Sequence, residues 1–136
     1  MNFEFSEEQQ LLREQARGFL SEHCSTAVVR AVLDGDADWD QSLWSKVVEL
    51  GWTATIVPEA YGGLGLSCYE LAVIAEELGR AVAPLPFSSS VYLAAEAINR
   101  LGTESQKSTW LPQLASGECV ATFAMAERPG RLTLDS

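Results

Sequence analysis

Apolar residues recur every three or four positions through most of the chain, which is the spacing that places them on one face of a helix. The first such stripe consists of Leu12, Ala16, Phe19 and Leu20. The segment Ser6-Glu-Glu-Gln9 precedes it and has the form of a capping box, with glutamates where the helix dipole favours negative charge. The pattern predicts a helix that begins at Ser6 and buries one face.

Start and stop signals divide the rest of this region into further helices. The start signal is a hydroxyl or carboxylate side chain before an apolar stripe, and the stop signal is a glycine after it. They predict a weak helix over 27–33 and a second helix that is capped by Asp38 or Asp40 and ends at Gly51. Three more helices are predicted: one that begins at Ser67-Cys-Tyr-Glu70, one that runs from Ser88 to Gly102, and one that begins at Thr103-Glu-Ser-Gln106. Because an interior proline disrupts a helix, we expect the last one to bend or end at Pro112.

The helix predicted after Ser67 has a clear division between its faces. Its apolar stripe is Leu71, Ile74, Ala75 and Leu78. Glu76 and Glu77 fall outside this stripe, so we expect both carboxylates to point away from the core.

A glycine-rich segment, Pro58-Glu-Ala-Tyr-Gly-Gly-Leu-Gly65, separates two of the helices. Proline fixes φ, and glycine permits backbone conformations that a Cβ atom would forbid. The segment is either a stiff connecting turn or a place where something approaches the backbone closely, and the local sequence leaves both readings open.

The pattern changes after Gly117. Residues 119–126 are rich in β-branched and aromatic side chains and show no helical stripe, which predicts a strand, and 131–135 alternate like a second strand. Two strands alone rarely hold together in water. The sequence therefore predicts a mainly α fold with one or two strands at its C-terminal end.

Charge and composition narrow the range of partners. The 136 residues carry a net charge of −10 and no basic cluster, which argues against nucleic acid and anionic membrane surfaces as partners. No apolar run has the length of a membrane span, and the N-terminus does not resemble a signal peptide, so we expect no membrane insertion and a cytoplasmic location. The three cysteines are far apart and predict neither a metal site nor a disulfide framework.

Groups suited to catalysis are scarce. The single histidine, His23, stands at the end of the first predicted helix, where interaction with the helix C-terminus is favoured over a role as a base. Gly62-Gly-Leu-Gly65 is not a phosphate loop, since no Lys-Ser/Thr follows it. Composition and spacing alone indicate an acidic, mainly helical domain.

The order of several short motifs resembles the N-terminal part of an acyl-CoA dehydrogenase, up to about Glu127. The matching pieces are Phe5-Ser-Glu-Glu-Gln-Gln-Leu-Leu12, Leu50-Gly-Trp52, Pro58–Gly65, Glu76-Glu-Leu-Gly79, Leu101-Gly-Thr-Glu-Ser-Gln-Lys107, Trp110-Leu-Pro-Gln-Leu114, Ser116-Gly-Glu118 and Thr122-Phe-Ala-Met-Ala-Glu127. Each is weak alone, and together they form a specific signature. The resemblance implies a helical domain over 1–117 and the beginning of a middle β domain over 118–136.

The resemblance also implies a chemistry. Enzymes of this family use FAD to oxidise an acyl-CoA thioester between its α and β carbons, and they pass the electrons to an electron-transfer flavoprotein. A glutamate base takes the α proton, and it comes from the C-terminal bundle or occasionally from another late position. FAD usually lies across a subunit interface of a dimer or tetramer. The resemblance therefore assigns no catalytic residue to this chain.

Site residues are carried over position by position. Phe123, Met125 and Ala126 match the segment beside the flavin ring, although many relatives have Thr or Ser at the position of Ala126. The family's usual Glu-Pro-Gly-Ala-Gly-Ser-Asp is replaced here by Glu127-Arg-Pro-Gly-Arg131 and Leu132. Ser88 and Tyr92 match the helix that lines the acyl pocket, with ordinary helix packing as the alternative.

Two hypotheses follow from this resemblance. In the first, the chain is part of an FAD-dependent acyl-CoA dehydrogenase and supplies acyl-pocket wall, flavin-side wall and oligomer contacts, while the isolated chain is inactive. In the second, it is a non-catalytic helical partner subunit or scaffold of a heteromeric acyl-CoA dehydrogenase. Both imply homo- or hetero-oligomers with related chains.

Overall fold

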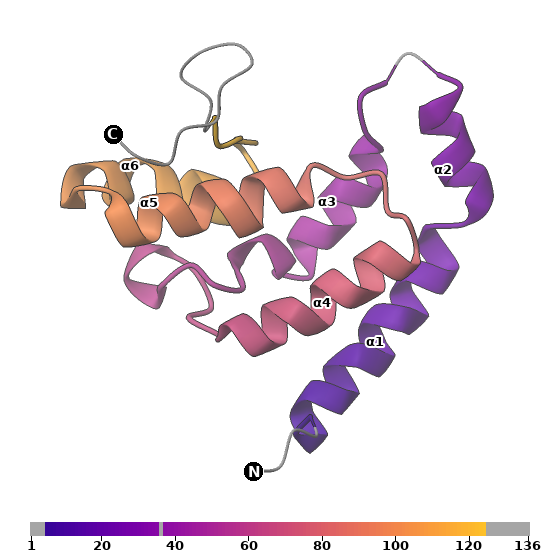
Figure 1. Cartoon of the computed structure of the whole chain (residues 1–136), viewed down its shortest axis with the longest axis horizontal. Coiled ribbons are helices and arrows are strands. Elements are labelled where there is room, and N and C mark those ends of the chain that lie inside the picture. Colours follow the sequence, from indigo (N-terminus) through magenta and orange to yellow (C-terminus); the bar gives the residue numbers. More distant parts are fainter. Residues whose placement is uncertain (1–4, 36, 125–136) are drawn as a thin grey trace, which may run out of the picture.

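The computed structural model describes residues 5–35 and 37–124, and this part of the chain is mainly helical (Figure 1). The α-helices are α1 (Glu7–His23), α2 (Thr26–Leu33), α3 (Gln41–Glu49), α4 (Cys68–Arg80), α5 (Glu96–Leu101) and α6 (Glu104–Ala115). Two short 3₁₀ helices, η1 (Trp52–Ala54) and η2 (Glu59–Tyr61), follow α3, and a π-helix, η3 (Ser88–Ala95), runs directly into α5. The mainly α fold class is confirmed.

The helix start signals in the sequence act as predicted. Ser6, Ser67 and Thr103 each form a complete capping box, in which the cap side chain and the side chain three residues later satisfy one another's backbone groups. Asp40 rather than Asp38 caps α3, because its carboxylate accepts a 2.7 Å hydrogen bond from the Leu43 N–H. These caps fix the residue at which each helix begins.

Two buried clusters hold the helices together, and η3 belongs to both. The first lies where α1, α3, α4 and η3 meet, and includes Ala16, Val47, Ile74 and Val91. The second joins η1, η3 and α6. α1 lies along α4, and α5 lies beside α6 (Figure 1). The π-helix is therefore fixed from two sides by the core.

The glycine-rich segment is a turn held by its own backbone. Gly62 and Gly65 have φ values of 82° and 60°, which L side chains rarely adopt. The Leu64 N–H donates to the Ala54 carbonyl over 2.9 Å. A Cβ atom on Gly63 would lie 1.9 Å from the Val57 carbonyl oxygen. The group that approaches the glycine backbone is thus the chain's own preceding segment, which supports the connecting-turn reading.

Three details of the prediction are corrected. Residues 119–124 form no strand, because a strand needs a neighbouring strand to pair with and the described residues provide none. The rest of that segment and 131–135 lie outside the described residues. Of the two outcomes expected at Pro112, a bend or an end, the end is wrong, because α6 continues to Ala115. Leu111, Leu114 and Ala115 are buried there. Glu77 does not point away from the protein, since only 1% of it is exposed.

Candidate functional site

The π-helix η3 carries both residues that the sequence assigned to a ligand wall, Ser88 and Tyr92. A π-helical turn is rare and frequently marks a functional region. Both residues line a cavity of about 290 Å³ between η3 and the C-terminal end of α4, which we call the α4–η3 cavity. Its other walls include Ala75, Leu78 and Phe87. The apolar stripe of α4 thus supplies cavity wall as well as core.

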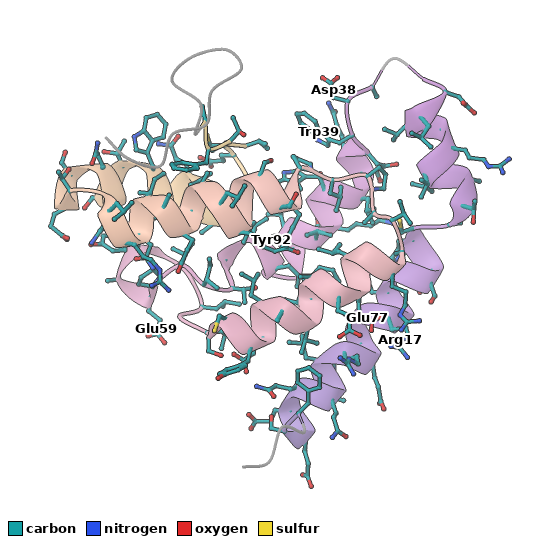
Figure 2. The ribbon with its side chains drawn as sticks, viewed as in Figure 1. Arg17, Asp38, Trp39, Glu59, Glu77 and Tyr92 are labelled. Carbon is teal, nitrogen blue, oxygen red and sulfur yellow. The ribbon has the colours of Figure 1, made fainter. Side chains whose placement is uncertain are left out.

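Tyr92 is the larger of the two side chains and is held firmly. Figure 2 shows Tyr92 between the η3–α5 run and α4. Its ring packs edge-to-face on Phe87, with 5.3 Å between the ring centroids, and the side chain is half-buried. Burial raises the pKa of the Tyr92 phenol to about 12. The group therefore stays neutral at physiological pH, while Ser88 is exposed at the cavity edge. Neither side chain is activated for proton transfer, so the cavity is suited to binding.

A second cavity lies on another side of the same helical run. It has a volume of about 490 Å³ and lies between α5, α6 and the segment after α6, and we call it the α5–α6 cavity. Phe123 and Trp110 line it, and each has 45% of its surface exposed. Phe123 is the only one of the three residues assigned to the flavin side that falls in the described part of the chain, since Met125 and Ala126 lie outside it.

Ser90 connects the π-helix to the segment after α6. Its side chain is buried, and its Oγ accepts a hydrogen bond of 3.4 Å from the Ala121 N–H. The Cys119 N–H donates to the Gln113 carbonyl oxygen over 3.1 Å. These bonds place the residues before Phe123 against η3 and α6. Nothing in the sequence indicated this role for Ser90, which stands in a run of three serines, Ser88–Ser90, that resembles a helix start.

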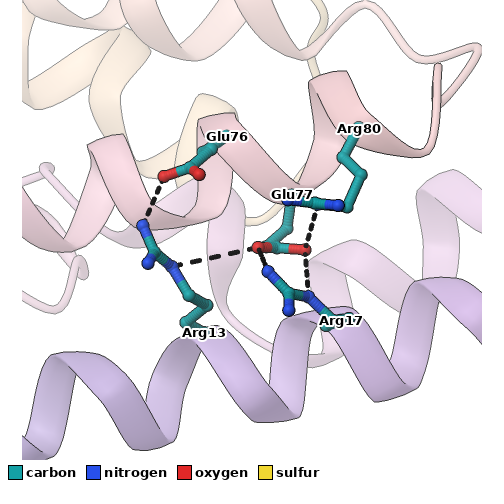
Figure 3. A network of polar contacts seen from close by, with 5 residues as sticks. All are labelled: Arg13, Arg17, Glu76, Glu77 and Arg80. Atoms are coloured by element: carbon teal, nitrogen blue, oxygen red, sulfur yellow. Dashed lines mark hydrogen bonds and ion pairs between the residues drawn. The ribbon is translucent and has the colours of Figure 1, made fainter.

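A buried carboxylate network joins α1 to α4 (Figure 3). Arg17 forms two hydrogen bonds with Glu77, of 2.7 and 3.0 Å, and Arg80 lies 3.5 Å from the same carboxylate. Arg13 pairs with the neighbouring Glu76. The pKa of the Glu77 carboxyl is held below its usual value, mainly by the hydrogen bonds from Arg17. The positive charges of Arg17, Arg80 and Arg13 lower this pKa further, and burial acts in the opposite direction. The carboxylate is fully committed to these arginines, so its role is to join two helices.

Other candidate groups do not assemble into a reactive site. The Lys46 ammonium group lies 3.0 Å from His23 Nδ1, and the imidazole ring packs on Phe19. Within 5–35 and 37–124 no group of three or more His, Cys, Asp or Glu residues is arranged to hold a metal ion. In those same ranges the cysteines are free thiols, and no helix is long and apolar enough to cross a membrane.

Comparison with known proteins gives one consistent result. Residues 6–118 match the family model described as acyl-CoA dehydrogenase, N-terminal domain. The chain is 33% identical over 129 residues to the probable acyl-CoA dehydrogenase YngJ of Bacillus subtilis (strain 168), a match that covers 93% of this chain and 33% of YngJ. The chain thus spans about a third of the length of the curated relatives it matches.

Solved structures agree with the sequence matches. The fold superposes on a chain of the ChsE4-ChsE5 complex from Mycobacterium tuberculosis with a TM-score of 0.86 and 27% identity, over 96% of this chain and 36% of the other. It superposes on the acyl-CoA dehydrogenase complexed with FAD from Bacillus anthracis with a TM-score of 0.79 and 29% identity, over 94% of this chain and 22% of the other. Both superpositions cover nearly the whole of this chain.

Proposed function

This chain belongs to the acyl-CoA dehydrogenase family, and from that premise we propose that it is the N-terminal part of an FAD-dependent acyl-CoA dehydrogenase. In this proposal residues 1–117 form the helical domain and 118–136 begin the middle β domain. The chain supplies one wall for the acyl group and one for the flavin. The remaining parts of the enzyme supply the catalytic base.

The α4–η3 cavity is the observation that carries the proposal. Ser88 and Tyr92 converge there with the apolar side chains of α4. An apolar wall favours a hydrocarbon chain by about 0.8 kcal/mol for each fully buried methylene group. A neutral phenol beside an exposed hydroxyl fits the binding of an uncharged acyl chain.

The α5–α6 cavity supports the flavin side of the proposal. Exposed Phe123 and Trp110 offer aromatic surface to a planar ring system, and a volume of about 490 Å³ falls in the usual range for ligand sites. FAD, when bound, accepts a hydride from the substrate. The role of this chain is to orient and cover one side of that cofactor, with Met125 and Ala126 proposed as further contacts.

A chimaeric enzyme tests this proposal. The region of YngJ that matches this chain is replaced by residues 6–126 of this chain, so that Phe123, Met125 and Ala126 are included. The purified protein is assayed for bound flavin and for acyl-CoA oxidation with an artificial electron acceptor. We expect flavin and activity in the chimaera, and neither in the isolated 136-residue chain. A folded chimaera that binds flavin but has lost acyl-CoA affinity would contradict the acyl-wall assignment.

A non-catalytic partner subunit is the second candidate. It is favoured by the high structural similarity to a chain from a complex of two named components, ChsE4 and ChsE5. In this reading the chain binds a related subunit, and the electron-transfer flavoprotein would receive electrons from that partner's flavin. To test this candidate, the chain is co-purified with a complete acyl-CoA dehydrogenase chain, and the activity of the complex is measured before and after Tyr92 of this chain is replaced. Co-purification with unchanged activity would favour the partner subunit over the first candidate.

A further inference from the structure

The π-helix η3 contributes wall to both of the cavities assigned to ligands. Ser88 and Tyr92 line the α4–η3 cavity, whereas Ala94, near the end of the same helix, lines the α5–α6 cavity. The segment that follows α6 supplies another part of the second cavity, through residues that include Ala121 and Phe123. The way this segment is attached to η3 therefore determines how the two cavities are placed relative to each other.

The attachment is the hydrogen bond between Ser90 and Ala121. The Ser90 side chain is only 1% exposed, and its Oγ accepts from the Ala121 N–H over 3.4 Å. Ala121 is itself half-buried, and a backbone donor with little access to water needs an acceptor. Among the described residues this is the last hydrogen bond of the segment before Phe123. Ser90 thus holds the segment at a point two residues from the exposed aromatic ring.

Other elements hold the start of this segment. The Trp44 indole N–H donates to the Gly117 carbonyl oxygen over 3.4 Å, and the Cys119 N–H donates to the Gln113 carbonyl oxygen over 3.1 Å. Trp44 lies on α3 and Gln113 on α6. These two bonds fix where the chain leaves α6, and the bond to Ser90 then ties the following residues to η3.

The π-helix is a firm support for the Ser90 hydroxyl group. Val91 belongs to the buried cluster that α1, α3 and α4 share with η3, and Ala95 belongs to the cluster that includes η1 and α6. Each of these two residues is only 1% exposed. Because close-packed side chains cannot shift without losing contacts, the part of η3 that carries Ser90 keeps a fixed position in the domain.

We propose that Ser90 is a positioning residue, which holds the flavin-side wall in a fixed place relative to the acyl wall. The inference rests on the proposed function, because it takes the α5–α6 cavity to face the flavin. Ser90 acts through Ala121 and Phe123 and contacts neither substrate nor cofactor. Since 3.4 Å is long for an N–H···O hydrogen bond, its loss should displace the wall without unfolding the domain.

Three substitutions of Ser90 in the chimaera with YngJ test this role. Ser90→Ala removes the acceptor, Ser90→Cys keeps a similar volume but accepts hydrogen bonds only weakly, and Ser90→Thr keeps the hydroxyl group. We expect Ser90→Ala and Ser90→Cys to bind flavin about threefold to tenfold more weakly, as the loss of one hydrogen bond allows, and to shift the visible absorbance bands of the flavin. Their kcat should fall by a similar factor, while the KM for acyl-CoA changes by less than about twofold, because the acyl wall stays in place. Ser90→Thr should retain the wild-type values.

The neighbouring serine provides a matched control. The Ser89 hydroxyl group donates to the Pro86 carbonyl oxygen over 3.1 Å, at the start of the same helix. Ser89→Ala therefore removes a hydroxyl group from η3 without changing the contact with the segment after α6, and flavin affinity and absorbance should stay as in the wild type. Circular dichroism and thermal denaturation report whether each variant is folded, and Ser90→Cys serves if Ser90→Ala is not.

Amide hydrogen exchange measures the same bond in the absence of flavin. In the 136-residue chain, the Ala121 N–H should exchange at least about threefold faster in Ser90→Ala than in the wild type, because its acceptor is gone. Amides of α1 and α4 should exchange at equal rates in the two proteins, since these helices are not attached to the segment.

The outcomes separate this inference from the proposed function. Unchanged flavin affinity and absorbance in folded Ser90→Ala, or equal Ala121 exchange with and without the Ser90 hydroxyl group, overturns the positioning role and leaves the proposed function standing. Equal losses in Ser89→Ala and Ser90→Ala overturn it as well. If the unsubstituted chimaera folds but binds no flavin, the proposed function and the positioning of a flavin wall are both wrong, and slow Ala121 exchange in the wild type then reports a purely structural bond.

Discussion

The Glu77 carboxylate accepts two hydrogen bonds from the Arg17 guanidinium group, one from Nη2 over 2.7 Å and one from Nε over 3.0 Å. Glu77 lies on α4 and Arg17 on α1, 60 residues earlier in the chain. A carboxylate that is only 1% exposed is costly unless it is paired, and this two-point pairing compensates for its burial. The contact fixes the position of α1 on the helix that also forms the cavity wall.

Removing the charge at position 77 should destabilise the fold. Glu77→Gln replaces one acceptor oxygen with an amide that faces arginine donors, and we expect the free energy of unfolding to fall by about 2 kcal/mol. The neighbouring Glu76→Gln is the control, because that carboxylate is half exposed and its pair with Arg13 should contribute less than about 1 kcal/mol. Urea denaturation of both variants measures the difference, and equal effects would contradict the assigned role of Glu77.

Stability should fall in acid through the same carboxylate. The pKa of Glu77 is lowered in the folded protein, mainly by the hydrogen bonds from Arg17, from an ordinary value of 4.5. Its contribution is therefore complete above that value and is lost as the pH falls through the lower pKa of the folded state. Denaturation between pH 7 and pH 3 checks this, and Glu77→Gln should show a shallower acid loss than the wild type.

The two kinds of glycine in the chain should respond oppositely to alanine. Gly63→Ala places a Cβ atom 1.9 Å from the Val57 carbonyl oxygen, so the turn must shift and stability should fall by more than about 2 kcal/mol. Gly18 lies at an exposed position of α1, and a Cβ atom there would have no neighbour within 4 Å, so Gly18→Ala should stabilise the protein by about 0.5–1 kcal/mol. Thermal denaturation compares them, and a neutral Gly63→Ala would mean that the turn tolerates repacking.

Helix caps provide a second matched pair. Ser67 caps α4 through a complete capping box, so Ser67→Ala should lower stability by about 1 kcal/mol. Ser25 precedes α2 without a side-chain hydrogen bond to the helix, so Ser25→Ala should change stability by less than about 0.5 kcal/mol. Chemical denaturation of the two variants tests the ranking, and a larger effect at Ser25 would reverse it.

Local signals in the sequence were enough for the helices and for the family. The capping boxes at Ser6, Ser67 and Thr103 form as predicted because they involve residues only three positions apart. Gly51 follows α3 in the left-handed conformation expected of a terminating glycine. Ser88 and Tyr92 were placed on one ligand wall by family resemblance, and the structure brings both to one cavity. Their role in binding stays a prediction.

Packing between segments that are distant in the sequence decided features that the pattern of apolar residues could not predict. The sequence by itself determined which segments are helical, the helix starts at Ser6, Ser67 and Thr103, and the family, because periodicity and capping depend on near neighbours. The tertiary structure selected Asp40 over Asp38 and gave 88–95 its π-helical form. The burial of Glu77 depends on Arg17, which reaches it only when α1 packs on α4. The α4–η3 cavity likewise exists only because α4 lies opposite η3. The tertiary structure alone decided these features, because partners distant in sequence determine whether a charge can be buried and where a cavity ends.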